Sequence, residues 1–389
     1  MKGKQLGVNV FIFLIFLTIY CVLGTILPER ANDMFGHATV AKEMMLGIRP
    51  TNGNFLMYWL AIIFSFFSHD ITRIIYSICF LLASATFLRF YISKQIIYKI
   101  DLYAGNEKKN YWFSLIMAVS LIFVFVIPLL SYLKYDEFYM GNFAANVWHN
   151  STIIFVFPFA ILLYLVSCRQ LENYRMKRDL LLLILIVINV LIKPSFLFVF
   201  VFIYPVVMLA KYRFSKSFWL SLLPILGCGV LILLMYWMIY ITNNNTVEAG
   251  EESRIVFAPF RAYKIYRNYL DFPICLILSI FFPLIYSIWN YKKLKGDRIY
   301  WYTVFLLIPA LLIYMLLVEE GPRFYHGILY WQIVVCVWLY FFVSLIRLIK
   351  DIKIEGYILR NKILLSFYSL HVLIGIIYLI RIIKTLGYA

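Results

Sequence analysis

The sequence has little charge and lacks any polar region large enough to form a soluble domain. Only 14% of its 389 residues are charged, whereas 64% are apolar and the mean hydropathy is +0.86. A soluble domain of this size is typically about half apolar and about a quarter charged, because water must wet its surface. This composition excludes a soluble globular protein. It predicts a single polytopic all-α integral membrane domain that covers residues 1–389.

Cysteine is scarce and follows no pattern. The chain has six Cys and no CxxC pair, and each Cys lies alone within or at the end of an apolar run. Disulfide frameworks and zinc sites need cysteines at close, repeated spacings, so we expect neither. His69 and His371 also lack partners at ligand spacing. The sequence therefore predicts no metal site and no cofactor, and whether a divalent cation takes part stays open.

Apolar runs of membrane length follow one another along the chain. A bilayer core of about 30 Å needs about 20 apolar residues in a helix. The first run follows Lys2 and Lys4 and has no cleavage site, which predicts a retained signal anchor. Lys193-Pro194-Ser195 divides a later run into two short helices, whose junction should lie below the membrane surface. We expect about eleven transmembrane helices, near residues 7–27, 71–92, 111–130, 151–167, 180–192, 196–210, 217–241, 271–290, 300–318, 327–347 and 363–383.

The net charge of +17 is explained by the sidedness of these helices. If the run 54–68 does not cross the membrane, 23 of the 36 Lys and Arg fall on one side. Cytoplasmic loops of membrane proteins are enriched in these residues. We therefore expect 54–68 to be an interfacial helix, the N-terminus to be cytoplasmic in the cell (inner or plasma) membrane, and no nucleic-acid partner. The larger external loops are then 28–70, 131–150, 242–270 and 319–326.

The first external loop carries the most suggestive pair of polar residues. Asn32 or Asp33 is placed to cap a helix that runs to about Leu46, which puts Asp33 and His37 on one face at positions i and i+4. Asp33 then either serves only as a cap or acts as general base toward an acceptor hydroxyl. His37 would orient that carboxylate or contact a phosphate.

The order of features in the first 95 residues resembles the GT-C superfamily of membrane glycosyltransferases. An acidic residue and a His follow the first transmembrane helix, and a short helix then ends near Gly47 and Pro50. An aromatic interfacial helix and an Asp70-x-x-Arg73 entry into the second span come next. The resemblance implies a polyprenyl-phosphate sugar donor and a base or acceptor-positioning role for Asp33. It assigns no subfamily, because the doubled acidic motif and the Pro-Pro pair common in those families are missing.

Three basic or imidazole residues are candidates for phosphate contact. Lys193 lies in the break between two short membrane helices, where an ammonium needs a partner such as a lipid phosphate or must extend toward the interface. Arg323 and His326 follow Gly321-Pro322, which suits the start of a helix, so both would lie near its positive end. The alternative for this second pair is a solvated loop with an internal Glu–Arg ion pair.

A basic stripe is expected in the third large external loop. Arg261, Lys264 and Arg267 recur every three residues between tyrosines. A short amphipathic helix would present them to lipid headgroups or to a pyrophosphate-linked glycan. The alternative is plain anchoring at the interface.

These features favour a glycosyltransferase that moves a sugar from a polyprenyl-phosphate donor to a lipid-linked glycan or other cell-surface acceptor. Asp33 and His37 would be catalytic, and Lys193, Arg323, His326, Arg261 and Lys264 would bind substrate or phosphate. A surface-polysaccharide or O-antigen polymerase, which also acts on lipid-linked repeat units, would use the same residue types. A transporter or flippase is the third class. It predicts charges buried in mid-span and a two-fold repeat, whereas most of the expected spans contain no charges and no repeat is visible.

Overall fold

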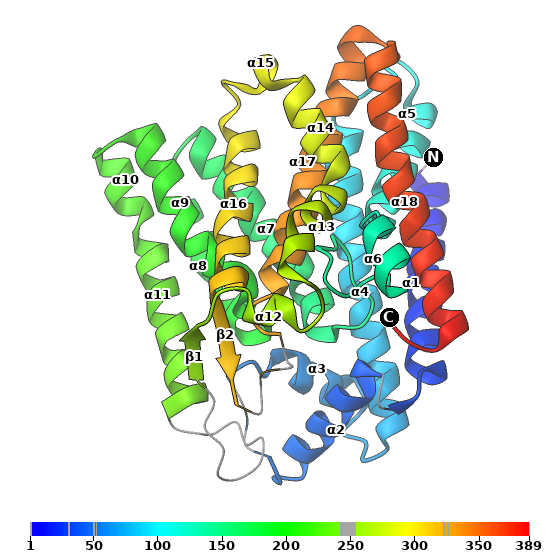
Figure 1. Cartoon of the computed structure of the whole chain (residues 1–389), viewed down its shortest axis with the longest axis vertical. Helices are drawn as coiled ribbons and strands as arrows, with labels where there is room; N and C mark the ends of the chain where they lie inside the picture. Colours follow the sequence, from blue (N-terminus) through cyan, green and yellow to red (C-terminus); the bar gives the residue numbers. More distant parts are fainter. Residues whose placement is uncertain are drawn as a thin grey trace.

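The computed structural model describes residues 2–29, 32–49, 51, 53–241, 254–321, 324 and 327–388. These residues form α-helices with short 3-10 and π-helical turns and one two-stranded antiparallel sheet (Figure 1). The elements are α1 (Lys2–Ile26), α2 (Asp33–Met45), α3 (Leu56–Phe64), α4 (Ile71–Tyr98), α5 (Glu107–Phe123), α6 (Leu129–Tyr135), α7 (Ser151–Glu172), α8 (Lys177–Ile192), η2 (Pro194–Phe196), α9 (Leu197–Tyr212), α10 (Lys216–Ser221), α11 (Leu223–Tyr236), η3 (Trp237–Ile241), β1 (Arg254–Phe257), α12 (Arg261–Lys264), η4 (Tyr269–Asp271), α13 (Phe272–Ser279), α14 (Phe281–Trp289), α15 (Tyr291–Leu294), α16 (Arg298–Leu316), β2 (Leu317–Glu320), α17 (Trp331–Glu355) and α18 (Leu359–Thr385).

Eight helices in the described ranges are long and apolar enough to cross a membrane, which supports a multi-pass membrane protein. They are α1, α4, α7, η2 with α9, α10 to η3, α16, α17 and α18. The segments Tyr269–Ser279 and Phe281–Trp289 add a ninth only if this pair, bent by 69°, counts as one crossing. The expected number of about eleven is therefore not confirmed. The difference arises because α5 and α8 have only 17 and 16 residues.

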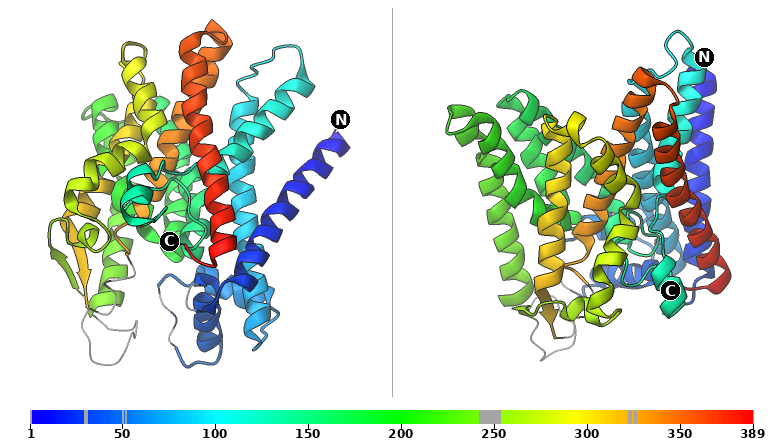
Figure 2. Two further views of the ribbon diagram at one scale, coloured as in Figure 1. Left: turned by 45° about the vertical axis from the view of Figure 1, so that its right-hand side comes forward. Right: turned by 45° about the horizontal axis from the view of Figure 1, so that its top comes forward.

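The helices form a bundle with two distinct ends. In Figure 1 the start of α5, α10, α15 and the turn between α17 and α18 lie at the top, whereas α2, α3 and the β1–β2 sheet lie at the bottom. The two turned views of Figure 2 keep these groups at opposite ends. α3 has nine residues and lies beside α2, so the run 54–68 does not cross the bundle, as expected. α7 and α17 are the central helices and are buried along most of their length.

An irregular segment lies inside the bundle between α5 and α7. α5 ends at Phe123, and the extended chain that follows leads into Pro128, which disfavours helix in the residue before it. The exposed peptide groups of this segment are paired from distant helices. Phe125 N donates to His371 O at 3.1 Å, and Ile127 N donates to Leu278 O at 3.3 Å. This pairing explains how non-helical backbone can stay within the apolar bundle.

His371 is a structural part of this arrangement. Its Nδ1 contacts the Phe125 carbonyl, and its Nε2 accepts from Phe282 N at 3.3 Å. Because a carbonyl only accepts and an amide only donates, the ring carries its hydrogen on Nδ1. Both ring nitrogens are thus used to hold chain segments together, and the residue is fully buried.

α4 carries a buried arginine, Arg89. α4 extends to Tyr98, so Arg89 lies within the helix, where its guanidinium faces the rings of Phe157 at 4.3 Å and Trp338 at 5.2 Å. Its NH2 group donates to Asn146 Oδ1, and no Asp or Glu of the described chain lies within ion-pair distance. Asn146 Nδ2 in turn donates to the Leu121 and Val124 carbonyls. Arg89 therefore supports the irregular segment after α5.

The break between α8 and α9 lies where the sequence predicted it. α8 ends at Ile192, Lys193 adopts an extended conformation with φ −166° and ψ 115°, and Pro194 opens η2. Proline cannot supply the N–H that a continuous helix needs. Asn54 Nδ2, from the loop before α3, donates to the Val190 carbonyl at 3.3 Å and so covers part of the exposed end of α8.

Candidate functional site

The cap of α2 is Asn32 and not Asp33. Asn32 is the N-cap of α2: its Oδ1 accepts from Met34 N at 3.1 Å and from Phe35 N at 3.3 Å. Its Nδ2 donates to Gly24 O at 2.8 Å, which ties the start of α2 to α1. Asp33 is therefore the first residue of the helix but not its cap. Its carboxylate is left for other contacts.

One oxygen of Asp33 is fully engaged and the other is open. Oδ2 accepts from the backbone N of Ser151, the first residue of α7, at 2.6 Å, and lies 3.4 Å from Nε2 of His37. Oδ1 has no hydrogen-bond partner among the described residues, and 29% of the side chain is exposed. The predicted i and i+4 pairing of Asp33 and His37 is confirmed, and Oδ1 remains accessible to a substrate group.

The surroundings keep the Asp33 carboxylate ionised. Burial alone would raise its pKa, but His37 and the hydrogen bonds from Ser151 outweigh it and lower the pKa well below the usual range. The carboxylate also lies at the positive end of α7, which favours the charged form. Asp33 thus offers a fixed negative charge and does not retain a proton near neutral pH.

His37 links this carboxylate to a phenol on α3. Its Nδ1 lies 2.9 Å from Tyr58 Oη. Because ionised Asp33 only accepts, Nε2 of His37 is the donor on that side, and Nδ1 shares a second hydrogen bond with the Tyr58 hydroxyl. Burial and the charge of Asp33 both raise the pKa of Tyr58, which keeps the phenol protonated. The two helices α2 and α3 thereby build a phenol–imidazole–carboxylate chain.

Lys193 contacts the same helical turn as Asp33. Its Nζ donates to Thr152 Oγ1 at 2.9 Å and to Asn150 Oδ1 at 3.2 Å, and lies 5.1 Å from the centre of the Trp331 ring. Asn150 is the N-cap of α7, and its Oδ1 also accepts from Ile153 N. The first turn of α7 therefore holds a carboxylate and an ammonium on neighbouring residues.

An aromatic group surrounds His149, which immediately precedes this turn. Its ring centroid lies 4.5 Å from that of Tyr139, 5.8 Å from Trp331 and 4.8 Å from Tyr388. Burial lowers the pKa of His149 to about 4, against a smaller upward effect of Asp33 and together with the charge of Lys193. His149 is therefore a neutral imidazole at pH 7.

The other predicted phosphate contacts do not join this group. Arg261 pairs with Glu320, and Lys264 lies 5.2 Å from the Tyr269 ring. The expected amphipathic stripe is wrong, because α12 has only four residues and Arg267 is buried in an ion pair with Glu137 at 2.7 Å. Arg261 and Arg267 thus link segments that are distant in the sequence. Arg323 and His326 lie outside the described residues.

Sequence reasoning missed most partners of Asp33 and Lys193. Asn150 stands directly before a long apolar run, and an Asn in that place is a helix-cap signal that could have pointed to this turn. Tyr58 and Trp331 were two of many aromatic residues. Tyr388 follows the last apolar run and gave no signal. Contacts between segments this distant cannot be read from spacing.

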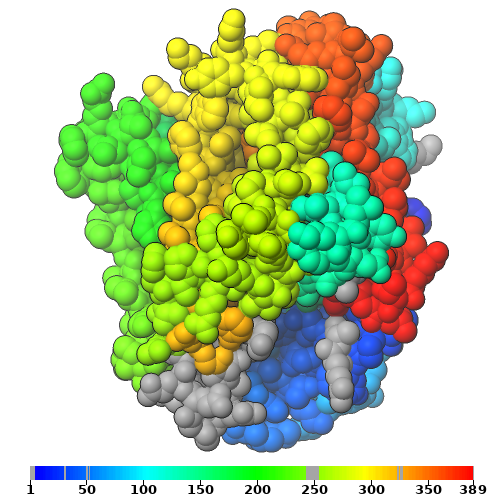
Figure 3. All heavy atoms as spheres, in the orientation of Figure 1, coloured from blue at the N-terminus to red at the C-terminus, as the bar shows by residue number. Residues whose placement is uncertain are grey.

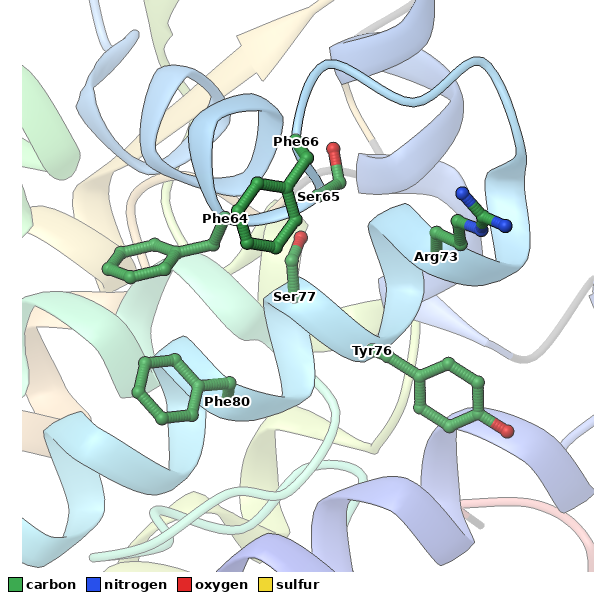
Figure 4. Close-up of a pocket in the computed structure, with 7 residues that line it drawn as sticks. All are labelled: Phe64, Ser65, Phe66, Arg73, Tyr76, Ser77 and Phe80. Atoms are coloured by element: carbon green, nitrogen blue, oxygen red, sulfur yellow. The ribbon is translucent and has the colours of Figure 1, made fainter.

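A shallow hollow of about 550 Å³ lies elsewhere, on the outer side of α3 and α4 (Figure 4). The Phe64 and Phe80 rings lie side by side there, 5.3 Å apart, with Arg73 and Tyr76 further along α4. Neither Asp33 nor Lys193 lines it. Exposed aromatic rings beside an arginine are typical of a surface in contact with lipid headgroups.

Similarity to known proteins does not assign a function to this chain. Within the described ranges no three His, Cys, Asp or Glu side chains are grouped so that they could hold a metal ion. No protein-family model matches the chain, and a search of the curated proteins gives no match. The function must therefore be inferred from the geometry of the site itself.

Proposed function

We propose that this protein is a membrane glycosyltransferase that moves a sugar from a polyprenyl-phosphate donor to a hydroxyl of a lipid-linked glycan or other cell-surface acceptor. The observation that carries the proposal is that Asp33 and Lys193 contact adjacent residues at the start of α7. Glycosyl transfer from a lipid phosphate needs a negative group at the acceptor hydroxyl and a positive group at the departing phosphate. Both are supplied within one helical turn.

The proposed step uses each group in a defined way. The acceptor hydroxyl donates a hydrogen bond to the open Oδ1 of Asp33, and its oxygen attacks the anomeric carbon of the donor. The bond between that carbon and the phosphate oxygen breaks, and the phosphate leaves with both electrons. Because the pKa of Asp33 is lowered, the carboxylate orients the hydroxyl and passes its proton on to the departing phosphate or to water.

Lys193 contributes by charge. The phosphate gains negative charge as the bond breaks, and an ammonium held by Asn150 and Thr152 needs no rearrangement to neutralise it. Its position over Trp331 keeps the ammonium partly shielded from water, which strengthens its interaction with an anion. Positioning and charge thus provide the catalysis, and no nucleotide-binding fold is required.

The location of the site fits an external reaction. α2, α3 and the start of α7 lie toward one end of the bundle, opposite α10, α15 and the turn between α17 and α18 (Figure 1). The loops at that opposite end are rich in Lys and Arg. If the basic end is cytoplasmic, as the positive-inside rule suggests, the N-terminus lies inside the cell and the site faces outward across the cell membrane. Membrane lipids then surround the bundle, and the lipid-linked donor reaches the site from the outer leaflet.

Of the alternative classes, transport has the least support. A transporter places ionisable side chains along a wet path within the membrane. Arg89 lies within a candidate span, but it is packed between Phe157 and Trp338 and bonded to Asn146. A polymerase of lipid-linked repeat units would use the same carboxylate and ammonium, so the product must distinguish it from a single-sugar transferase.

The test is a profile of lipid-linked glycans by mass spectrometry in cells that lack the chain and express either wild type or Asp33→Asn. An Asn side chain still accepts from Ser151 N, so the fold should persist, while the negative charge is lost. We expect a glycan one sugar short with Asp33→Asn and at least about a 100-fold loss of product. Asp70→Asn is the matched control, since Asp70 is exposed and caps α4 through Thr72 N.

Three outcomes separate the candidates. The transferase is supported if the deletion strain makes a glycan one sugar short, and if wild type and Asp70→Asn restore the full glycan but Asp33→Asn does not. Complete single repeat units without polymer would identify the polymerase instead. A normal profile in the deletion strain, or full product with Asp33→Asn at normal protein level, would overturn the proposal.

A further inference from the structure

The segment after α18 returns to the site. Leu386 adopts a left-handed conformation with φ 53°, which reverses the chain at the end of the helix. Tyr378 Oη donates to the Tyr388 carbonyl at 3.1 Å and holds the reversed segment against α18. The Tyr388 ring then lies 4.8 Å from the His149 ring, centroid to centroid. Two residues from opposite parts of the chain therefore meet beside the first turn of α7.

Each of these two residues presents a buried polar atom without a partner. His149 Nδ1 and Tyr388 Oη have no hydrogen-bond partner in the part of the chain that the structure describes, and both atoms are shielded from solvent. Buried polar atoms in folded proteins nearly always have a partner, because leaving water without one costs free energy. Two such atoms on touching rings point to a group that binds between them or across them.

The hydrogen-bonding properties of His149 Nδ1 and Tyr388 Oη indicate which chemical group can bind to them. Burial lowers the pKa of His149 to about 4, so the neutral ring has one donor and one acceptor nitrogen. Burial and the nearby charge of Asp33 raise the pKa of Tyr388, so its phenol stays a donor that can also accept. A hydroxyl, which both donates and accepts, satisfies such a pair.

An anion does not fit this place. The negative charge of Asp33 acts on both His149 and Tyr388 and would repel a phosphate there. The ammonium of Lys193, whose charge also acts on His149, is already bonded to Asn150 and Thr152, the residues on either side of Ser151. Tyr139 and Trp331 are buried and pack edge-on against His149, so the surroundings of the two polar atoms are largely apolar and uncharged.

We propose that His149 and Tyr388 form a hydroxyl-binding subsite beside Asp33 that holds a neutral sugar of the acceptor. The subsite explains why a tyrosine beyond the last membrane helix is folded into the bundle. It rests on the proposed function only in assigning the bound sugar to the acceptor. Binding of a sugar hydroxyl by this pair can be measured without any transfer reaction.

The experiment uses the full-length chain in lipid nanodiscs with ¹⁵N-labelled histidine. The chain has five His, so the ring nitrogens can be resolved, and His149→Gln assigns the resonances of His149. Methyl glycosides of common hexoses are the probes, and inorganic phosphate is the comparison. We expect the glycosides to shift the His149 Nδ1 resonance at millimolar concentration, with no matching shift from phosphate.

Tyr388→Phe tests the second half of the pair, since it retains the ring and removes only the hydroxyl. We expect it to weaken glycoside binding about five-fold, as for the loss of one neutral hydrogen bond. Tyr357→Phe is the control, because that phenol is half-exposed and contacts Tyr103 at the other end of the bundle. Unchanged His371 resonances show in each variant that the fold is intact.

The result can overturn the subsite independently of the proposed function. The subsite is wrong if glycosides leave the His149 resonances unchanged in wild type, if phosphate shifts them instead, or if Tyr388→Phe binds as wild type does. If glycosides bind here but deletion of the chain leaves cellular glycans unaltered, the subsite is supported and the glycosyltransferase is not. If the glycan profile changes as expected but glycosides do not bind at His149, the glycosyltransferase is supported and the subsite is not.

Discussion

Gly375 of α18 lies so close to Phe123 of α5 that a methyl group cannot fit between them. A Cβ atom on Gly375 would stand 1.6 Å from the Phe123 carbonyl oxygen and 3.2 Å from Phe125 Cβ. The first of these neighbours is backbone, so a side-chain rotation cannot relieve the clash. The close approach lets α18 reach the irregular segment after α5 and supply its missing hydrogen bonds.

Gly375→Ala should therefore destabilise the protein in spite of the better helix propensity of Ala. We expect a loss of about 3 kcal/mol, the upper part of the usual range for overpacking, seen as a lower apparent Tm in detergent. Gly229→Ala is the matched control in α11, since an added Cβ there meets nothing within 4 Å. Equal Tm values for the two variants would mean that α18 and α5 are not in this contact.

Tyr58→Phe should impair turnover and leave the amount of protein unchanged. The substitution retains the ring but removes the hydroxyl that lies 2.9 Å from His37 Nδ1. His37 would then hold Asp33 less firmly, and we expect about a ten-fold fall in product formation, as for the loss of about 1.4 kcal/mol of transition-state stabilisation. Initial rates of glycan extension in membranes test this. A variant as active as wild type would show that the phenol plays no part.

Lys193 should respond to charge more than to shape. Lys193→Met removes the ammonium, and we expect about a 50-fold loss of transfer, in line with the loss of roughly 2.3 kcal/mol for a charged hydrogen bond. Lys193→Arg retains the positive charge and should recover part of that loss. The KM for the lipid-linked donor and kcat are measured in all three proteins. Lys295→Met, at an exposed position on the opposite end, should behave as wild type.

Acid should weaken the fold through His149. Its pKa is lowered to about 4 in the folded chain, below the ordinary value near 6.5, so the unfolded state binds the proton first as the pH falls. Stability is therefore complete above about pH 6.5 and declines between pH 6.5 and 4. We expect a loss of about 1 kcal/mol at pH 5, reduced from the full linkage by the partial exposure of the ring.

The charged and titratable groups beside His149 keep their protonation states over the pH range of this test. Asp33 and Lys193 carry opposite charges near His149, and Tyr388 stays protonated over the whole range. Asp33, with its lowered pKa, does not titrate between pH 7 and 5. The Tm of His149→Gln should accordingly depend less on pH than that of wild type. The same slope in both proteins would assign the effect to another residue.

The sequence predicted local features well because they depend on neighbouring residues. The pairing of Asp33 with His37, the cap at Asn32 and the break at Lys193 all follow from short-range rules of helix geometry. The ends of α5 were less predictable. Apolar composition continues to residue 127, but the helix stops at Phe123 because Asn146 and His371 offer alternative hydrogen bonds.

The assembly of the site could not be predicted from the sequence. Ser151 reaches Asp33 across 118 residues, and Tyr388 reaches His149 only because Leu386 reverses the chain. The periodicity of apolar residues does not encode such contacts. It also gave a basic stripe at Arg261 and Arg267 that does not exist, since each arginine pairs with a different carboxylate.

The end of α8 has a consequence for how the chain is inserted during synthesis. Asn54, which covers the Val190 carbonyl, emerges from the ribosome 136 residues before it. α8 has 16 residues and ends in peptide groups that lipid cannot satisfy. The hydrogen bonding at the end of α8 therefore depends on a loop that is synthesised before it. A fragment beginning after α3 would lack Asn54 and would leave the Val190 carbonyl without this hydrogen bond.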